Sequence, residues 1–117
     1  MTMRTSRLIG VLLLLLSLAA CAPADVDSPE SVKRLIDSGV LVVDVRSEEE
    51  FQSGHLEGAL NVPHTEIEEN LAVFGADKEK PIVVYCRSGR RSGIAKEVLE
   101  KNGFTSVHNG GGYEDLK

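Results

Sequence analysis

Valine-rich apolar runs alternate with amphipathic stretches along most of this chain. Residues 40–45 (VLVVDV) and 81–86 (PIVVYC) are almost entirely apolar, a pattern that favours strands covered on both faces over strands with one solvated face. Two shorter strands are expected at 59–63, where a proline ends the run, and at 104–109. These four segments are the candidate strands of one sheet.

Capping residues and glycines mark the helices between these strands. Residues 28–39 have a serine N-cap, a proline at the first helical position and a glycine at the end, which together predict a helix. Capping boxes at 47–50 and 65–68 predict two further helices, the second with an apolar stripe. Residues 92–103 have apolar positions on one face and a terminal glycine, so they predict a fourth helix.

The order of these elements indicates the fold class. Strands alternate with helices through residues 29–117, which predicts a single α/β domain with a small, mainly parallel sheet flanked by helices. The glycines at 110–112 are expected to form a tight turn, with Tyr113 covering apolar surface and at most one helical turn after it. Ligands of such sheets bind at the carboxyl ends of the strands, and Cys86 lies at such an end.

The first 20 residues have a different pattern. Arg4 and Arg7 precede a mostly apolar run of 13 residues, Leu8–Ala20. A helix of this length rises about 20 Å, which is less than the roughly 30 Å of a bilayer's hydrocarbon core. A basic start, a short apolar centre and small residues before a boundary are typical of an export signal. Residues 1–20 are therefore expected to be a signal peptide and not a permanent membrane span.

The end of this segment resembles the lipobox of bacterial lipoproteins. Residues 18–21 (LAAC) match the lipobox at all four positions. The resemblance implies cleavage before Cys21, lipidation of its thiol, and a membrane anchor of several acyl chains, with residues 21–28 as a short tether. The implied location is the bacterial cell envelope, facing the periplasm or the exterior. In a Gram-negative host, Ala22 favours the outer membrane over the inner one. An ordinary secretory signal that ends near a cysteine is the alternative.

The charge balance limits the partners of the protein. The chain has 13 basic and 18 acidic residues, a net charge of −5. Removal of residues 1–20 takes away two basic residues and no acidic ones, which leaves 11 against 18 and a net charge of −7. Such a surface repels nucleic acid and anionic lipid, so no nucleic-acid partner is expected. The remaining 97 residues are enough for one small domain, which we expect to be monomeric.

Cys86 is unusual in an exported chain. The sequence has two cysteines, and if lipid occupies Cys21, Cys86 has no partner in a compartment where exposed thiols oxidise. Such a thiol is either buried and inert or retained for chemistry. A disulfide between Cys21 and Cys86 is the alternative if Cys21 carries no lipid.

The residues after Cys86 form a short, basic loop between a buried strand and a helix. Backbone amides of such a loop, the positive end of a helix dipole and nearby guanidinium groups all favour a thiolate over a thiol. Cys86 is therefore the candidate nucleophile for an anionic, electrophilic substrate. The candidate substrate-binding residues are Arg87, Ser88, Gly89, Arg90, Arg91 and Ser92. A partly buried cysteine with solvated arginines nearby is the alternative interpretation.

Three stretches resemble the signature regions of the rhodanese family, in family order and with family spacing. They are LVVDVRSEEEFQSGHLEGALNVPH at 41–64, YCRSGRRSGIAKEVLEKNGF at 85–104 and NGGGYEDL at 109–116. The resemblance is to small exported single-domain thiosulfate sulfurtransferases, and it implies a rhodanese-like domain. In such a protein the Cys86 thiolate takes the outer sulfur of thiosulfate, releases sulfite and holds a persulfide.

The same resemblance implies the reaction partners. The donor is a small anionic sulfur compound, and the acceptor is thiophilic, either cyanide in an assay or a thiol in the cell. It implies no metal and no organic cofactor.

Loop length distinguishes this interpretation from its closest competitor. Cysteine phosphatases and arsenate reductases of related fold have five residues between the cysteine and an arginine, whereas here four residues separate Cys86 from Arg91 and Ser92 occupies the later position. The shorter loop leaves less room for a tetrahedral oxyanion above the thiol. A rhodanese-like binding or scaffold module without catalysis is a further possibility, as is a redox role for Cys86.

Residues outside the loop are expected to support it. The resemblance suggests that Asp44 supports the loop from below and that Arg46 pairs with Glu50 in a structural network. A solvated position at the strand end is the alternative for Arg46. His55 matches a family position and is interpreted as stabilising the fold. His64 and His108 have no other ligand residues at metal-binding spacing, so no metal site is expected.

Overall fold

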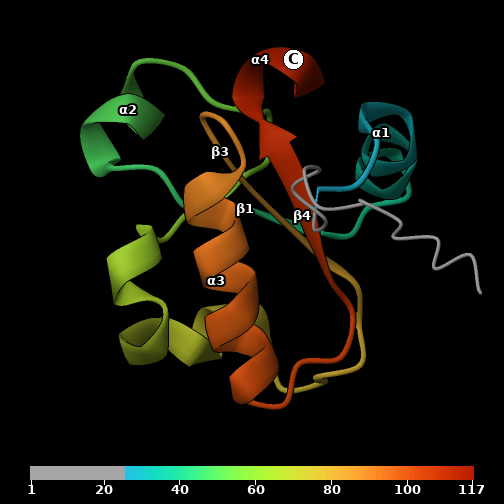
Figure 1. The fold of residues 1–117 in the computed structure, drawn as a ribbon, viewed down its shortest axis with the longest axis vertical. Helices are drawn as coiled ribbons and strands as arrows, with labels where there is room; N and C mark the ends of the chain where they lie inside the picture. Colours follow the sequence, from blue (N-terminus) through green and yellow to red (C-terminus); the bar gives the residue numbers. More distant parts are fainter. Residues whose placement is uncertain (1–25) are drawn as a thin grey trace, which may run out of the picture.

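The computed structural model describes residues 26–117 (Figure 1). The proposed signal peptide at 1–20, Cys21 and most of the proposed tether lie outside the described residues. Within residues 26–117, the helices are too short or too polar for any of them to cross a bilayer.

Four parallel strands form a single sheet. In chain order the strands are β1 (Leu41–Asp44), β2 (Leu60–Asn61), β3 (Ile82–Cys86) and β4 (Val107–Gly112), and their order across the sheet is β2-β1-β3-β4. The predicted α/β class and parallel sheet are therefore confirmed. β3 is central and every residue of it is buried, which agrees with its uniformly apolar sequence.

Helices cover both faces of the sheet (Figure 1). The helical segments are α1 (Pro29–Asp37), α2 (Glu48–Gln52), the 3-10 helices η1 (His64–Glu66) and η2 (Glu68–Phe74), α3 (Arg90–Lys101) and α4 (Tyr113–Leu116). Two predicted N-termini are confirmed. Ser28 caps α1 ahead of a proline, and Ser47 and Glu50 form the capping box of α2.

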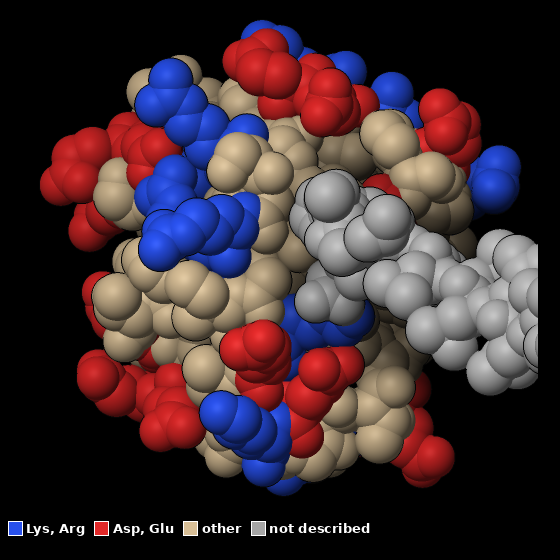
Figure 2. All heavy atoms as spheres, viewed as in Figure 1, with Lys and Arg blue, Asp and Glu red and all other residues tan. Residues whose placement is uncertain are grey.

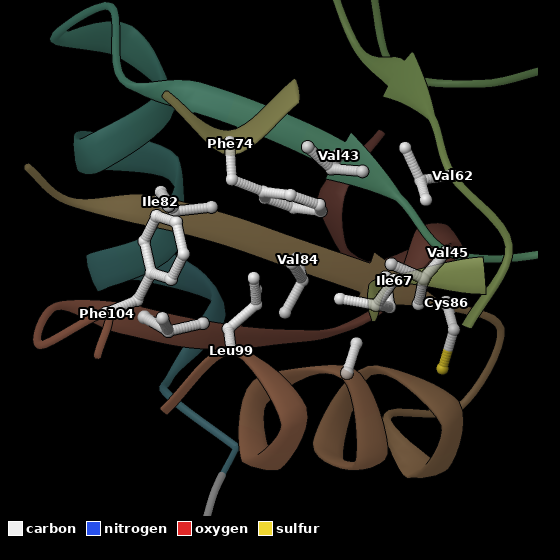
Figure 3. Close-up of a cluster of buried hydrophobic side chains, with 12 residues drawn as sticks. Val43, Val45, Val62, Ile67, Phe74, Ile82, Val84, Cys86, Leu99 and Phe104 are labelled. Atoms are coloured by element: carbon white, nitrogen blue, oxygen red, sulfur yellow. The ribbon is translucent and has the colours of Figure 1, made fainter. Parts of the chain in front are cut away.

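The strands divide their side chains between two cores. Val43, Val84 and Cys86 point to one face and pack with η2 and with Leu99 of α3 (Figure 3). On the other face, Val42, Val83 and Tyr85 pack with α1 and α4. Because successive strand residues face opposite ways, the position of Cys86 in the strand determines that its sulfur lies on the α3 side.

The predicted α-helix after the capping box at 65–68 is wrong. The segment forms two short 3-10 helices, and no side-chain capping bond is present at either start. Pro63 precedes the first, and Asn70 breaks the helical path with φ −128°, where its side chain donates to the Glu66 carbonyl at 2.8 Å. Ile67 and Phe74 of the predicted apolar stripe are nevertheless buried in the core.

The predicted tight turn at 110–112 is also wrong, because these glycines extend β4. They occur where a side chain has no room. A Cβ on Gly110 would lie 3.1 Å from Val83, and one on Gly112 would lie 2.6 Å from the Arg87 carbonyl oxygen. Gly111 has φ +81°, near an irregularity in the pairing of β3 with β4. The single helical turn expected after them is present as α4.

The first described residues run beside β4. Val26 forms an isolated parallel bridge with Asn109, and the Asp27 amide donates to the Asn109 carbonyl at 2.9 Å. The Asp27 carboxylate lies 2.7 Å from Nδ1 of His108. The Val26 side chain packs close to the backbone of Gly89 and Gly111, where an added Cβ would meet it at 3.1 and 3.0 Å. The segment before α1 is therefore attached to β4 next to the loop that follows β3.

Candidate active site

Cys86 is the last residue of β3, at the carboxyl end of the central strand. It is the free cysteine of the described residues, and it is 0% exposed. Its sulfur points toward the first turn of α3, with Val45 and Ile67 nearby in the same core (Figure 3). The expected position of Cys86 at a strand end, directly before a helix, is thus what the structure shows.

Hydrogen-bond donors converge on the Cys86 sulfur. The amide of Gly89 donates to Sγ at 3.0 Å and the amide of Ser92 at 3.4 Å, while the Ser92 hydroxyl oxygen lies 3.4 Å from Sγ. Gly89 has φ +100°, a conformation in which the loop turns back and directs its amide inward. α3 begins at Arg90, two residues earlier than predicted, so the Ser92 amide belongs to the first turn, where amides have no helical partner.

These contacts change the ionisation of Cys86. Burial raises the pKa of the thiol, but hydrogen bonds from the Ser92 hydroxyl, when its proton points to the sulfur, and from the amides of Ser92, Ser88 and Gly89 outweigh burial, so the pKa is lowered. The expected preference for a thiolate therefore has a physical cause in the amides, and in the hydroxyl whenever its proton points to the sulfur.

The three loop arginines have different environments. Arg87 and Arg90 are exposed, so the guanidinium groups of these two residues can contact a solute. Ser88 is exposed as well. Arg91 is bound to Glu50, with Nη1–Oε1 at 2.7 Å and Nη2–Oε2 at 3.0 Å. Figure 2 shows basic side chains grouped on the upper left of the displayed face, in the region where Figure 1 draws the start of α3 and the loop before it, with acidic side chains at the left edge beside them.

Arg46 does not pair with Glu50 as expected. Its guanidinium binds the buried Asp44 carboxylate, with Nη2–Oδ2 at 2.6 Å and Nε–Oδ1 at 2.9 Å, and it also donates to the Gly54 carbonyl at 2.6 Å. The Arg46 amide donates to the same carboxylate at 2.9 Å, which fixes Asp44 beside it. Glu50 is already occupied by the Ser47 cap and by Arg91. The Asp44–Arg46 pair lies at the end of β1, beside β3.

A small cavity opens next to the loop. It measures about 250 Å³. Its lining residues are Arg46, Glu50, Ser53, Arg87, Tyr113 and Glu114. This volume lies below the range typical of pockets for drug-sized ligands, so the cavity suits a small solute.

Asn109 is a site residue that the sequence interpretation missed. It is 1% exposed, and its Oδ1 accepts from the Ser92 hydroxyl at 2.7 Å while its Nδ2 donates to the Gly89 carbonyl at 2.9 Å. The only local signal for it is a polar residue directly before three glycines at the end of a strand. A buried amide with several partners holds its surroundings in one arrangement, so Asn109 connects β4 to the loop.

The histidines lie apart from the cysteine cradle. His55 stacks on Phe51 at a ring distance of 3.6 Å, and its Nδ1 lies 2.8 Å from the Phe51 carbonyl, so its contacts join the end of α2 to the residues after it and suit a role in the fold. His108 contacts Asp27. Within residues 26–117 no three potential ligand residues lie close enough together to hold a metal ion.

Comparison with known proteins identifies the family. Residues 28–117 match the model of the rhodanese-like domain, so the chain belongs to the rhodanese-like family. It is 45% identical over 74 residues to the thiosulfate sulfurtransferase PspE of Escherichia coli (strain K12), which covers 63% of this chain and 71% of that protein. It is 33% identical over 88 residues to the thiosulfate sulfurtransferase GlpE of Pseudomonas aeruginosa, covering 74% and 78% of the two chains.

Solved structures agree with this assignment. A structure described as a rhodanese with anions from E. coli aligns with a TM-score of 0.62 and 43% identity, covering 66% of this chain and 91% of that one. The human single-domain sulfurtransferase TSTD1 aligns with a TM-score of 0.63 and 30% identity, covering 80% and 95%.

Proposed function

We propose that this protein is a thiosulfate sulfurtransferase that carries sulfur on Cys86. The observation that supports this most directly is the convergence of the Gly89 and Ser92 amides on the Cys86 sulfur, at 3.0 and 3.4 Å. The same donors that stabilise a thiolate also stabilise the negative charge of a persulfide. Relatives at 45% and 33% identity are named thiosulfate sulfurtransferases, which supports thiosulfate as the donor.

The first step forms the persulfide. The Cys86 thiolate attacks the outer sulfur of thiosulfate, and a new S–S bond forms. The S–S bond inside thiosulfate breaks, and sulfite leaves with the electron pair of that bond. Cys86 then carries a terminal sulfur with one negative charge, and no electrons are gained or lost overall.

The second step returns the enzyme to its starting state. A thiophilic acceptor attacks the terminal sulfur, the Cys86 S–S bond breaks, and the Cys86 thiolate is the leaving group. Cyanide becomes thiocyanate in this step, and a thiolate becomes a persulfide. The low pKa of Cys86 favours both steps, since the thiolate is the nucleophile of the first and the leaving group of the second.

The exposed arginines fit the charge of the donor. Thiosulfate is a dianion, and Arg87 and Arg90 extend from the loop into solvent on a chain whose net charge is −5. A local positive field of this kind raises the concentration of an anion near the loop. Arg87 also lines the cavity beside the loop, so an anion in that cavity would meet the guanidinium of the residue that directly follows Cys86.

Mass spectrometry of the purified protein after thiosulfate treatment tests this proposal. A gain of one sulfur atom on the peptide containing Cys86 is expected, followed by its loss on addition of cyanide with release of thiocyanate. The control is Cys86→Ala, which removes the sulfur but keeps the apolar contacts. Equal thiocyanate production by this variant, or an unmodified Cys86 peptide in the wild type, contradicts the proposal.

The two alternative functions, a cysteine phosphatase and a binding module without catalysis, predict different results. Hydrolysis of an aryl phosphate that is lost in Cys86→Ser indicates a cysteine phosphatase. A protein that binds thiosulfate without either reaction is a rhodanese-like binding module.

We also propose that Cys21 is lipidated and anchors the domain in the bacterial cell envelope, facing the periplasm or the exterior. The support is the LAAC sequence after a short apolar segment at the start of the chain. Cys21→Ser is expected to move the protein from the membrane fraction to the soluble fraction. An unchanged distribution contradicts lipidation.

A further inference from the structure

Asn109 presents an acceptor, and not a donor, to Ser92. Its side chain has two backbone partners: Oδ1 accepts from the Gly111 amide at 3.0 Å, and Nδ2 donates to the Gly89 carbonyl at 2.9 Å. An amide N–H only donates and a carbonyl only accepts, so these partners decide which side-chain atom is the oxygen. That oxygen lies 2.7 Å from the Ser92 hydroxyl.

The Ser92 hydroxyl has one proton and two neighbours that compete for it. Asn109 Oδ1 has no proton to give, so Ser92 must be the donor in the 2.7 Å bond. Ser92 Oγ then turns its lone pairs toward Cys86 Sγ, which lies 3.4 Å away. This arrangement is favourable when Cys86 is a thiol that donates to Oγ, and unfavourable when Cys86 is a thiolate.

Ionisation of Cys86 reverses the preference of the hydroxyl. When the thiol proton leaves to solvent, the Ser92 hydroxyl gains by turning from Asn109 to the negatively charged sulfur, because hydrogen bonds to an ion are stronger than neutral ones. Asn109 Oδ1 keeps the Gly111 amide as a partner, so it is not left unpaired. Cys86, Ser92 and Asn109 are 0%, 0% and 1% exposed, so water does not compete freely for these groups.

We propose that Asn109 is a positioning residue that holds the Ser92 hydroxyl away from Cys86 and so favours the thiol until the hydroxyl turns. Asn109 then acts against the amides of Gly89 and Ser92, which favour the thiolate. The inference rests on the proposed function only in taking Cys86 as the nucleophile. Its consequence is a cysteine that is reactive, but less so than its amide cradle alone would make it.

A double-mutant cycle of Asn109 and Ser92 tests the inference. The measured quantity is the fraction of Cys86 present as thiolate, obtained from the ultraviolet absorbance of the thiolate as a function of pH. The full chain carries Cys21→Ser, so that Cys86 is the remaining thiol. Asn109→Leu, which keeps the shape but not the acceptor, is made with Ser92 present and with Ser92→Ala. With Ser92 present, the thiolate fraction one pH unit below the wild-type midpoint is expected to rise about threefold to fivefold.

With Ser92→Ala, the same Asn109→Leu change is expected to leave the thiolate fraction unchanged or to lower it, because no hydroxyl is there to be released. An equal change in both backgrounds, or no rise with Ser92 present, overturns the inference, since a purely structural role acts with or without the hydroxyl.

Asn109→Asp gives a second measurement if the leucine variant does not fold. It keeps the acceptor with a stronger charge, so it is expected to lower the thiolate fraction more with Ser92 present than with Ser92→Ala. Equal lowering in both backgrounds overturns the inference. The titration uses no thiosulfate, so absence of sulfur transfer contradicts the proposed function without affecting this result.

Discussion

Glu50 and Arg91 form a two-point ion pair across 41 residues of sequence, with N–O distances of 2.7 and 3.0 Å. Glu50 is also the capping-box residue of α2, so one carboxylate joins the start of α2 to the active-site loop. The arginine at the end of the loop is thus neutralised by the protein itself, and Arg87 and Arg90 remain as the exposed cations of the loop.

The first prediction concerns stability against pH. Hydrogen bonds from the Arg91 side chain and from the Ser47 cap lower the pKa of Glu50 to about 2, although burial acts in the opposite direction. A carboxylate with a lowered pKa in the folded state stabilises the protein above its unfolded pKa of about 4.3, and this contribution is lost as the pH falls through about 2. Because both side chains are partly exposed, we expect Glu50→Gln to lower the free energy of unfolding near pH 7 by only about 1 kcal/mol.

Urea unfolding of the wild type and Glu50→Gln near pH 7 and near pH 2 measures this effect. The difference between the two proteins is expected to shrink at the lower pH. A difference of equal size at both pH values would show that the carboxylate charge contributes nothing.

The second prediction concerns donor binding. Arg87→Ala and Arg90→Ala are each expected to raise KM for thiosulfate about threefold to fivefold with little change in kcat, because an exposed charge that attracts an anion contributes up to about 1 kcal/mol. Arg91→Ala is expected to raise KM less, since Glu50 already neutralises that guanidinium. Steady-state kinetics of thiocyanate formation at low and high salt provides the measurement. Equal increases in KM for all three variants would contradict the distinction between the exposed Arg87 and Arg90 and the paired Arg91.

The third prediction concerns the buried pair under the loop. Asp44→Asn leaves the Arg46 guanidinium without its carboxylate at a site where Asp44 is 0% and Arg46 6% exposed. Removal of one partner of a buried ion pair costs roughly 3–5 kcal/mol, so a large loss of stability is expected in urea unfolding. Glu100→Gln, which breaks a surface pair with Lys96 at 4.0 Å, is the matched control and should change stability little. Similar losses in both variants would mean that burial does not strengthen the Asp44–Arg46 pair.

The fourth prediction concerns the contact between β4 and the loop. Gly112→Ala places a Cβ 2.6 Å from the Arg87 carbonyl oxygen, a distance that forces the loop to move. We expect sulfur transfer to fall by at least about tenfold, because small displacements of catalytic groups are costly. Gly93→Ala is the control, since its Cβ would meet the Asn109 side chain at 3.4 Å, an ordinary contact. Full activity in Gly112→Ala would show that the loop adapts without loss.

Local signals in the sequence predicted most of the fold. The apolar strands β1 and β3 and the capped helices α1 and α2 depend on residues within one segment, and the structure confirms them. The 3-10 helices at 64–74 depart from their capping-box signal because the Asn70 side chain bonds back to the Glu66 carbonyl. The capping-box pattern at 65–68 does not include Asn70, so it cannot indicate that the side chain of Asn70 competes with the backbone for this carbonyl.

The site was predictable as far as Cys86 and its loop, which are contiguous in sequence. Asn109 was missed because it reaches the loop through space, 17 residues after Ser92. The partner of Arg46 was misassigned for a related reason. Glu50 and Asp44 are both near Arg46 in sequence, and only the position of Arg91, 41 residues after Glu50, decides which carboxylate is left for Arg46.

The attachment of Val26 beside the loop limits how far the site can lie from residue 21. Four residues lie between Cys21 and Val26, and the five Cα-to-Cα steps that join the two span no more than about 18 Å when fully extended. Val26 itself packs close to Gly89, whose amide binds the Cys86 sulfur. A lipid on Cys21 would therefore confine the nucleophile to a thin layer at the bilayer surface. Its sulfur donors and acceptors would have to enter that layer, so reaction rates would depend on their density along the membrane as well as on their concentration in bulk.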